Sequence, residues 1–168
     1  VYAYPEEVRN GYQLNVEVDI NSEEVNNTSL TIVNELFSPE GKLVAKDSKR
    51  LTAKPGNDNK LITSLNINKP ALWSLSDPNL YELKTTILRD GVETDQATTR
   101  TGFRTYTFDP NKGFALNGEW MKVKGVCIHH DAGGLGAAVP RDVWKRRLQT
   151  LNGIGVNAVR TRHKPQAT

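Results

Sequence analysis

The sequence has little of several residue types, and each shortage narrows what the chain can be. It contains one cysteine, Cys127, so no disulfide can form within the chain. Because Cys127 lies in an apolar run, we expect a small, buried hydrophobic side chain there. No apolar run is long enough to cross a bilayer, so we expect no membrane-spanning helix and no membrane partner.

Methionine is also scarce, because Met121 is the only one and the chain begins at Val1 without a visible signal peptide. We therefore interpret the chain as part of a longer protein. The compartment is not specified by the residues present. A periplasmic or extracellular location is favoured, with any signal peptide upstream of Val1.

Charge is modest overall but unevenly distributed along the chain. Residues 1–108 carry 12 basic and 15 acidic side chains, a net charge of −3, whereas residues 109–168 carry 10 and 4, a net charge of +6. A basic segment can indicate nucleic-acid binding. Here no stacking aromatic residues separate the basic clusters, so we expect no nucleic-acid partner.

Residues 1–108 have the pattern of an immunoglobulin-like β-sandwich. Leu14, Val16, Val18 and Ile20 alternate with polar residues, which indicates a half-buried strand, and Asp90-Gly91 indicates a tight hairpin. Several short strands with turns at regular intervals and no helical period are typical of a sandwich. The expected strands are residues 11–20, 29–37, 42–51, 61–67, 80–88, 92–99 and 102–108.

The sequence pattern changes in residues 109–168. There we expect a linker, a hairpin at Asn117-Gly118 and a strand-helix-strand unit. Two apolar runs, within 124–131 and 157–165, stop abruptly at polar residues. The segment between them predicts a helix over 140–151, with Trp144, Leu148 and Leu151 on one face and Gly153 as its cap. The predicted fold class is therefore mainly β, a sandwich followed by a partial β-α-β unit.

Titratable residues gather just past the two apolar runs, which is where parallel sheets place their chemistry. All three histidines, His129, His130 and His163, lie there, together with Asp131 and Arg160. The His-His-Asp tripeptide could suggest a metal site, but three consecutive residues cannot surround an ion, so we expect no metal. Arg160 could also pair with an acidic neighbour. Trp73 and Trp120 could stack on sugars, although core or interface positions are the more common use of such residues.

Several short motifs in the last hundred residues resemble glycoside hydrolase family 2, the family of β-galactosidases, β-glucuronidases and β-mannosidases. The motifs occur in the family's order and at its usual spacing. They are Leu72-Trp73-Ser74, Pro78-Asn79-Leu80-Tyr81, Gly102-Phe103-Arg104, Phe114 to Gly118, Lys124-Gly125-Val126 with His129, and Gly155 to Thr161 with His163 and Pro165. The resemblance implies that residues 1–108 are the immunoglobulin-like domain, and that residues 109–168 are a linker hairpin and the first β-α-β unit of an incomplete TIM barrel.

The resemblance also implies roles for individual residues. His129 and His163 would hydrogen-bond to hydroxyl groups of the terminal sugar, and Arg160 would orient the nucleophilic carboxylate and keep it ionised. The family often has Arg-Thr-Ser-His-Tyr-Pro where this chain has residues 160–165. This chain has Arg160-Thr161-Arg162-His163-Lys164-Pro165, in which Lys164 replaces an aromatic residue or an asparagine at the rim of the pocket.

The implied function is that of a retaining, exo-acting β-glycosidase, with β-galactosidase favoured by the segment that follows His129. It would hydrolyse terminal β-galactosides in oligo- or polysaccharides, without a cofactor. β-Glucuronidase is the alternative enzyme, and a non-catalytic carbohydrate-binding or scaffold sandwich is an alternative of another class. Because two parallel strands and one helix leave open edges, we also expect this chain to self-associate.

We expect the isolated 168-residue polypeptide to have no glycosidase activity. Retaining hydrolysis needs two carboxyl groups about 5 Å apart, and no such pair stands at the two predicted strand ends. The family's two catalytic glutamates come from later barrel strands. Incubation with a chromogenic β-galactoside measures the glycosidase activity of the polypeptide. Turnover that survives its repurification would show the expectation to be wrong.

Overall fold

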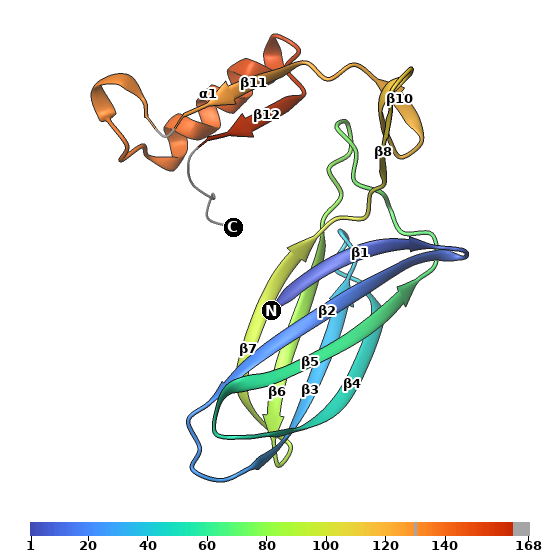
Figure 1. The fold of residues 1–168 in the computed structure, drawn as a ribbon, viewed down its shortest axis with the longest axis vertical. Coiled ribbons are helices and arrows are strands. Elements are labelled where there is room, and N and C mark those ends of the chain that lie inside the picture. The colour runs from blue at the N-terminus through green and yellow to red at the C-terminus, as the bar shows by residue number, and fades with distance from the viewer. Residues whose placement is uncertain (130, 163–168) are drawn as a thin grey trace. The chain divides into compact units, whose positions relative to one another are not determined.

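The computed structural model describes residues 1–129 and 131–162, and the chain divides into two compact units, Val1–Tyr106 and Thr107–Thr168. The first unit is built from antiparallel sheets, and the second contains a small antiparallel sheet and a parallel strand pair with a helix (Figure 1). The mainly β fold class predicted from the sequence is thus confirmed. The limits 1–108 and 109–168 stay a prediction.

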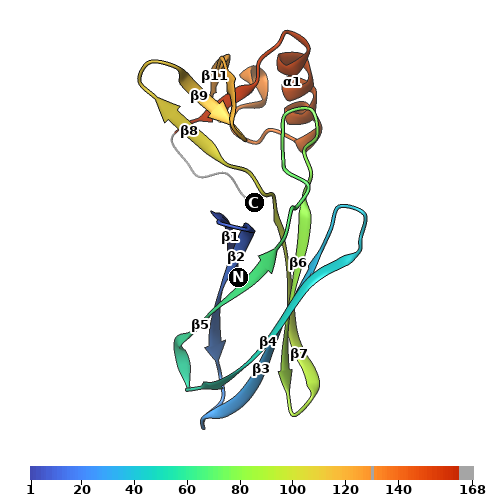
Figure 2. The same cartoon turned by 90° about the vertical axis from the view of Figure 1, so that its right-hand side faces the viewer.

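The first unit is a sandwich of two sheets, which face one another in both views (Figures 1 and 2). One sheet has the order β1-β2-β5 and the other the order β4-β3-β6-β7. The strands are β1 (Tyr2–Val8), β2 (Gly11–Ser22), β3 (Thr28–Phe37), β4 (Leu43–Ala53), β5 (Gly56–Ile67), β6 (Tyr81–Arg89) and β7 (Val92–Thr101).

The alternation seen in the sequence determines which side chains fill the sandwich. On β2, Leu14, Val16 and Val18 are fully or almost fully buried, and Ile32, Leu36 and Leu83 meet them from the other sheet. Burying an aliphatic side chain of this size stabilises the fold by about 1.5–3 kcal/mol. This apolar layer holds the two sheets together.

Strand β1 is missing from the sequence prediction because its residues do not look like a strand. It contains Pro5 and the adjacent carboxylates Glu6 and Glu7, all of which are uncommon inside strands. The structure shows that β1 is an edge strand paired only with β2. At an edge, a proline can be accommodated because its missing N–H costs no ladder hydrogen bond on the open side.

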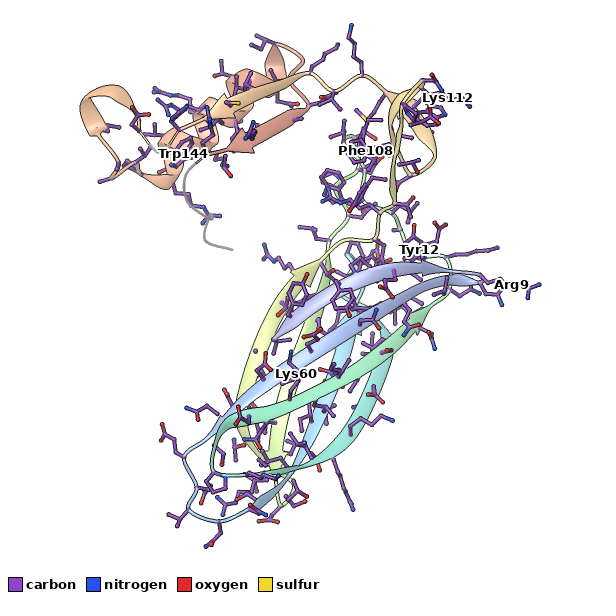
Figure 3. The ribbon with its side chains drawn as sticks, in the orientation of Figure 1. Arg9, Tyr12, Lys60, Phe108, Lys112 and Trp144 are labelled. Carbon is purple, nitrogen blue, oxygen red and sulfur yellow. The ribbon has the colours of Figure 1, made fainter. Side chains whose placement is uncertain are left out.

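The outer face of the β1-β2-β5 sheet is covered by polar contacts rather than by apolar packing. Asn15 is buried although it points outward, because its amide donates to Glu6 Oε2 at 2.9 Å and its Oδ1 accepts from Ser64 Oγ at 3.0 Å. Nearby, Lys60 donates to Glu17 at 2.8 Å. This hydrogen bond, aided by the charge of Asp19, raises the pKa of Lys60 above its ordinary value. The Lys60 side chain is labelled in Figure 3.

The predicted strand over 102–108 is wrong in its first half. Phe103 makes only an isolated bridge with Leu72, and its fully buried ring packs edge-on against Tyr12 and Tyr81, with centroids 5.5 and 4.9 Å apart. The Tyr81 hydroxyl accepts a hydrogen bond from the Ala71 N–H at 2.8 Å. This aromatic cluster closes the sandwich, so the chain cannot continue there as a regular strand.

The second unit begins with a three-stranded sheet of order β10-β9-β8. Its strands are β8 (Tyr106–Asp109), β9 (Gly113–Leu116) and β10 (Glu119–Met121). The predicted hairpins are confirmed, since Asn117 and Gly118 have φ of 52° and 82° and Asp90 and Gly91 have φ of 51° and 82°. Positive φ at both central residues is the requirement of a type I′ turn, which glycine and asparagine or aspartate meet with little strain.

A β-α-β unit follows. It consists of β11 (Gly125–Ile128), a short 3₁₀ turn η1 (Gly133–Leu135), the helix α1 (Arg141–Gly153) and β12 (Ala158–Thr161), with β11 and β12 parallel. The helix was predicted to be capped by Gly153, but Gly155 takes that role with φ of 85°. The N–H groups of Gly155 and Val156 donate back to Asn152 and Leu151, which is a Schellman motif.

One further prediction about this unit is wrong. Cys127 was expected to be buried but is exposed, because the described helix covers only the other side of β11. Leu148, on the predicted apolar face of α1, is 46% exposed, and Arg147 is half-buried. Self-association through this unit stays a prediction.

A polar bridge crosses the apolar core of the sandwich. Asn34 on β3 is fully buried; its amide donates to Thr63 Oγ1 on β5 at 3.1 Å, and its Oδ1 accepts from Thr85 Oγ1 on β6 at 2.7 Å. Asn34 and Thr85 are register partners in one sheet, whereas Thr63 belongs to the other. The asparagine therefore links the two sheets through a pair of buried hydrogen bonds.

We predict that Asn34→Ala lowers the free energy of unfolding by about 2–3 kcal/mol, because two buried hydrogen bonds are lost and two threonine hydroxyls lose their partner. Urea titration followed by circular dichroism measures this. The matched control is Asn66→Ala on the exposed face of β5, which should change the free energy by less than about 0.5 kcal/mol. Equal small effects of the two substitutions would contradict the prediction.

Candidate functional site

The candidate site lies where β11 and β12 end. Parallel strands end at the same edge of a sheet, and the register pairs Cys127 with Arg160 and Ile128 with Thr161. His129 directly follows β11, so it stands two residues beyond the level of Arg160. The sequence prediction placed these residues near one another, and the register brings together His129 and Arg160.

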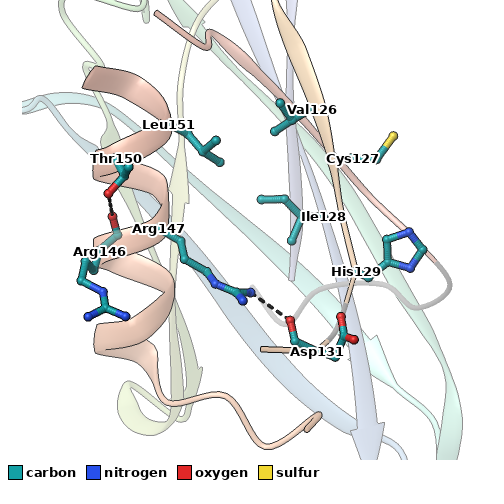
Figure 4. Close-up of a pocket in the computed structure, with 9 residues that line it drawn as sticks. All are labelled: Val126, Cys127, Ile128, His129, Asp131, Arg146, Arg147, Thr150 and Leu151. Atoms are coloured by element: carbon teal, nitrogen blue, oxygen red, sulfur yellow. Dashed lines mark hydrogen bonds between the residues drawn. The ribbon is translucent and has the colours of Figure 1, made fainter. Parts of the chain in front are cut away.

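The two faces of the strand pair have different surroundings. Val126 and Ile128 point toward α1 and are half-buried, whereas Cys127 and His129 point away from the helix (Figure 4). Because directly paired residues of neighbouring strands share a face, Arg160 lies on the same side as Cys127. The helix-free face therefore carries the thiol of Cys127, the imidazole of His129 and the guanidinium of Arg160.

Asn157 fixes the position of β12 against the segment that leads into β11. Its Oδ1 accepts a hydrogen bond from the Lys124 N–H at 2.8 Å, and its Nδ2 donates to the Lys122 carbonyl at 2.9 Å. The Asn157 N–H also donates to the Lys124 carbonyl at 3.0 Å. Asn157 thus determines the register that sets Arg160 beside Cys127. No role for Asn157 was predicted from the sequence, although an asparagine directly before an apolar strand is a usable signal.

Arg147 connects α1 with the loop that follows β11. Its Nη1 donates to the Asp131 carbonyl at 2.9 Å, as Figure 4 shows, and its guanidinium lies over the Trp144 ring, 5.2 Å from the centroid. The loop also closes on itself, since the Ala132 N–H donates to the Gly136 carbonyl and the Gly136 N–H donates to the Gly133 carbonyl. Arg147 thus links this loop to the helix at Asp131.

A cavity of about 750 Å³ lies between β11 and α1. Its apolar lining comes from Val126, Ile128 and Leu151, and the remaining lining residues are Cys127, His129, Asp131, Arg146, Arg147 and Thr150 (Figure 4). The cavity shows that the helix does not seal this side of the strand.

Of the residues singled out in the sequence, His130 and His163 lie outside the described residues. Asp131 contributes its backbone carbonyl, which accepts the hydrogen bond from Arg147. Within residues 1–129 and 131–162, no three histidine, cysteine or acidic side chains are close enough to hold a metal ion, and no helix is long and apolar enough to span a membrane.

The two tryptophans considered as sugar platforms have different surroundings, and neither belongs to the buried core. Trp73 is half-buried, with the Arg104 guanidinium 4.9 Å from its ring centroid. Trp120 is 45% exposed, with Lys112 Nζ 5.5 Å from its centroid. A cation thus lies against each ring.

Comparison with known families identifies the chain. The sequence model described as "Glycosyl hydrolases family 2" matches residues 1–104, and the model of that family's TIM barrel domain matches residues 110–168. The chain belongs to glycosyl hydrolase family 2. The parallel strand pair with its crossover helix is the start of the family's TIM barrel domain, and the fold class predicted from the sequence is confirmed.

Family 2 relatives with two different activities match the chain to a similar degree. A β-galactosidase of Bacteroides ovatus, BoGH2A, is 38% identical over 154 residues, which cover 92% of this chain and 18% of the relative. A β-glucuronidase of Bacteroides fragilis is 37% identical over 128 residues, covering 76% of this chain and 18% of the relative. The chain thus spans about a fifth of the length of these family 2 proteins.

Solved structures of family 2 proteins show the same fold. A family 2 member from Bacteroides cellulosilyticus superposes with a TM-score of 0.89 at 27% identity, covering 98% of this chain and 23% of the other. A β-glucuronidase from Bacteroides uniformis superposes with a TM-score of 0.90 at 26% identity, covering 99% and 20%.

We predict that Arg147→Met loosens the loop after β11 in this family 2 chain. The substitution keeps much of the side-chain volume but removes the charged donor to the Asp131 carbonyl, which is worth about 1 kcal/mol at an exposed position. The amide protons of Ala132, Leu135 and Gly136 should then exchange roughly fivefold faster, as measured by hydrogen exchange.

Arg146→Met is the matched control, because no hydrogen bond or ion pair involves the Arg146 side chain within the described part of the chain. It should leave the exchange rates unchanged. Equal exchange in the two variants would show that Arg147 does not hold the loop.

Proposed function

We propose that the full-length protein containing this chain is a retaining, exo-acting β-glycosidase that removes terminal β-galactosides from oligo- or polysaccharides. The observation that carries the proposal is the pairing of β11 with β12, which aligns His129 and Arg160 on one face where both strands end. In TIM barrels, the ends of the strands form the active site. Membership of family 2 supports the same reaction class.

Each proposed residue has a role that its chemistry can fulfil. The imidazoles of His129 and His163 can donate and accept hydrogen bonds, which suits the hydroxyl groups of a terminal sugar. The Arg160 guanidinium is permanently charged, so it can orient a nucleophilic carboxylate and lower its pKa. The two carboxyl groups of retaining hydrolysis would come from other barrel strands of the full-length protein.

A β-glucuronidase is the second candidate. It is favoured by the β-glucuronidase of Bacteroides fragilis, whose identity to this chain is close to that of the β-galactosidase. Direct comparison of 4-nitrophenyl β-galactoside and β-glucuronide as substrates of the full-length protein distinguishes the two. Hydrolysis of neither substrate would show the proposed activity to be wrong.

We predict that Arg160→Ala in the full-length protein lowers kcat/KM on the better substrate by roughly a hundredfold, about 2.7 kcal/mol of transition-state stabilisation. The same loss is expected for His163→Ala. Both residues are proposed to act on the nucleophile or the sugar, so the melting temperature should stay within a few degrees of the wild type. Steady-state kinetics and thermal unfolding of the same preparations measure the two effects.

The matched control is Arg141→Ala, an exposed arginine at the start of α1. It should leave both kcat/KM and the melting temperature close to the wild-type values. A variant at residue 160 that unfolds at a much lower temperature and has normal kinetics when folded would instead assign Arg160 to an ion pair that stabilises the barrel.

A further inference from the structure

Asn157 connects segments that are distant in the sequence. Its Oδ1 accepts from the Lys124 N–H at 2.8 Å and its Nδ2 donates to the Lys122 carbonyl at 2.9 Å, across 33 and 35 residues. Both polar ends of the amide are therefore in use, one as an acceptor and one as a donor. Asparagine is the shorter of the two side chains that end in a neutral amide, so few replacements supply both contacts.

These contacts stand at the start of the strand pair, whereas Arg160 stands near its end. The Asn157 and Ala158 N–H groups both donate to the Lys124 carbonyl, at 3.0 and 3.3 Å. From there the register continues to Arg160, which is opposite Cys127. Arg160 is three residues beyond Asn157, which is about 10 Å along a strand. The amide therefore acts on the guanidinium through the backbone of β12.

The strands themselves specify this register only weakly. β12 has four residues, and only Ala158 and Val159 are apolar. A hydrophobic pattern of two residues gives little preference for one alignment over its neighbours, and a slip by one residue would turn Arg160 to the face of α1. No tight turn sets the alignment either, because parallel strands are joined by a crossover. The side chain of Asn157 supplies the specification that the apolar pattern does not.

We infer that Asn157 is a positioning residue for the glycosidase reaction, because it holds Arg160 at the level where its guanidinium meets the nucleophilic carboxylate. The inference rests on the proposed function and deepens it, since it assigns part of the rate to a residue that acts through another. A small displacement of a group that orients the nucleophile slows the chemical step more than it weakens the binding of substrate. The loss should therefore appear in kcat and should require Arg160.

The first test is kinetic and uses the full-length protein with 4-nitrophenyl β-galactoside and β-glucuronide. We expect Asn157→Ala to lower kcat by roughly tenfold on the better substrate and to change KM by less than about twofold. Asn157→Asp keeps an oxygen for the Lys124 N–H and loses the donor to the Lys122 carbonyl, so its kcat should lie between. The aspartate variant also provides the test if the alanine variant does not fold. Wild-type kcat in the folded variants would overturn the inference.

A double-mutant cycle separates positioning from general stabilisation. In a protein that already carries Arg160→Ala, adding Asn157→Ala should lower kcat by less than about twofold, because the group to be positioned is gone. A tenfold loss in both backgrounds would show that Asn157 acts independently of Arg160 and that the inference is wrong. Asn34→Ala is the control for lost stability, since its contacts lie in the sandwich, and it should leave kcat unchanged. An equal loss of kcat in this control would likewise contradict the inference.

Hydrogen exchange of the same proteins tests the contacts of Asn157 independently of activity. Peptides that cover residues 122–128 and 157–162 should exchange roughly fivefold faster in Asn157→Ala than in the wild type, and at the wild-type rate in Asn34→Ala. Unchanged exchange in Asn157→Ala would overturn the inference whatever the kinetics. If the wild-type protein hydrolyses neither substrate, the proposed function fails, and the role of Asn157 in the reaction fails with it. Faster exchange would in that case still show that Asn157 holds the two strands.

Discussion

The parallel pairing of β11 with β12 is the constraint on which the candidate site depends. Two strands that run in the same direction must be joined by a crossover, and they must end at the same edge. Here α1 makes the crossover, Gly155 ends the helix, and Asn157 fixes the register. His129 and Arg160 are far apart in sequence, but they share one face as a direct result. A shift of β12 by one residue would turn Arg160 toward the helix and remove it from that face.

The sandwich depends on a simpler constraint, the period of two along its strands. Apolar residues at alternate positions of β2, β3 and β6 meet in one layer, and the aromatic cluster of Phe103, Tyr12 and Tyr81 closes it. Different features of the sequence thus specify the two units. The sandwich is specified by local alternation and tight hairpins, whereas the β-α-β unit is specified by residues that act over long separations, such as Asn157 and Arg147.

This difference explains what could be predicted from the sequence. Alternation and the Asp-Gly and Asn-Gly turns are local signals, so the strands of the sandwich and both hairpins were found. Strand β1 was missed because pairing at an edge permits Pro5, and the start of the 102–108 strand was wrong because aromatic packing around Phe103 overrides strand propensity. In the candidate site, the places of His129 after β11 and of Arg160 on β12 could be predicted from the apolar runs, whereas their roles stay predictions. Arg147 was not predicted, because its role depends on a contact between a helix and a backbone carbonyl that no spacing encodes.

The buried Asn34 bridge has a consequence for misfolded states of the sandwich. Both sheets are rich in alternating apolar residues, so sliding one strand by two positions would keep the apolar side chains inside. Such a slip would move Asn34 away from Thr63 and Thr85 and leave a buried amide without partners, which is a costly arrangement in an apolar interior. The apolar residues favour compact arrangements in general, whereas the asparagine raises the energy of those that are almost correct. The asparagine therefore separates the native register from its nearest competitors.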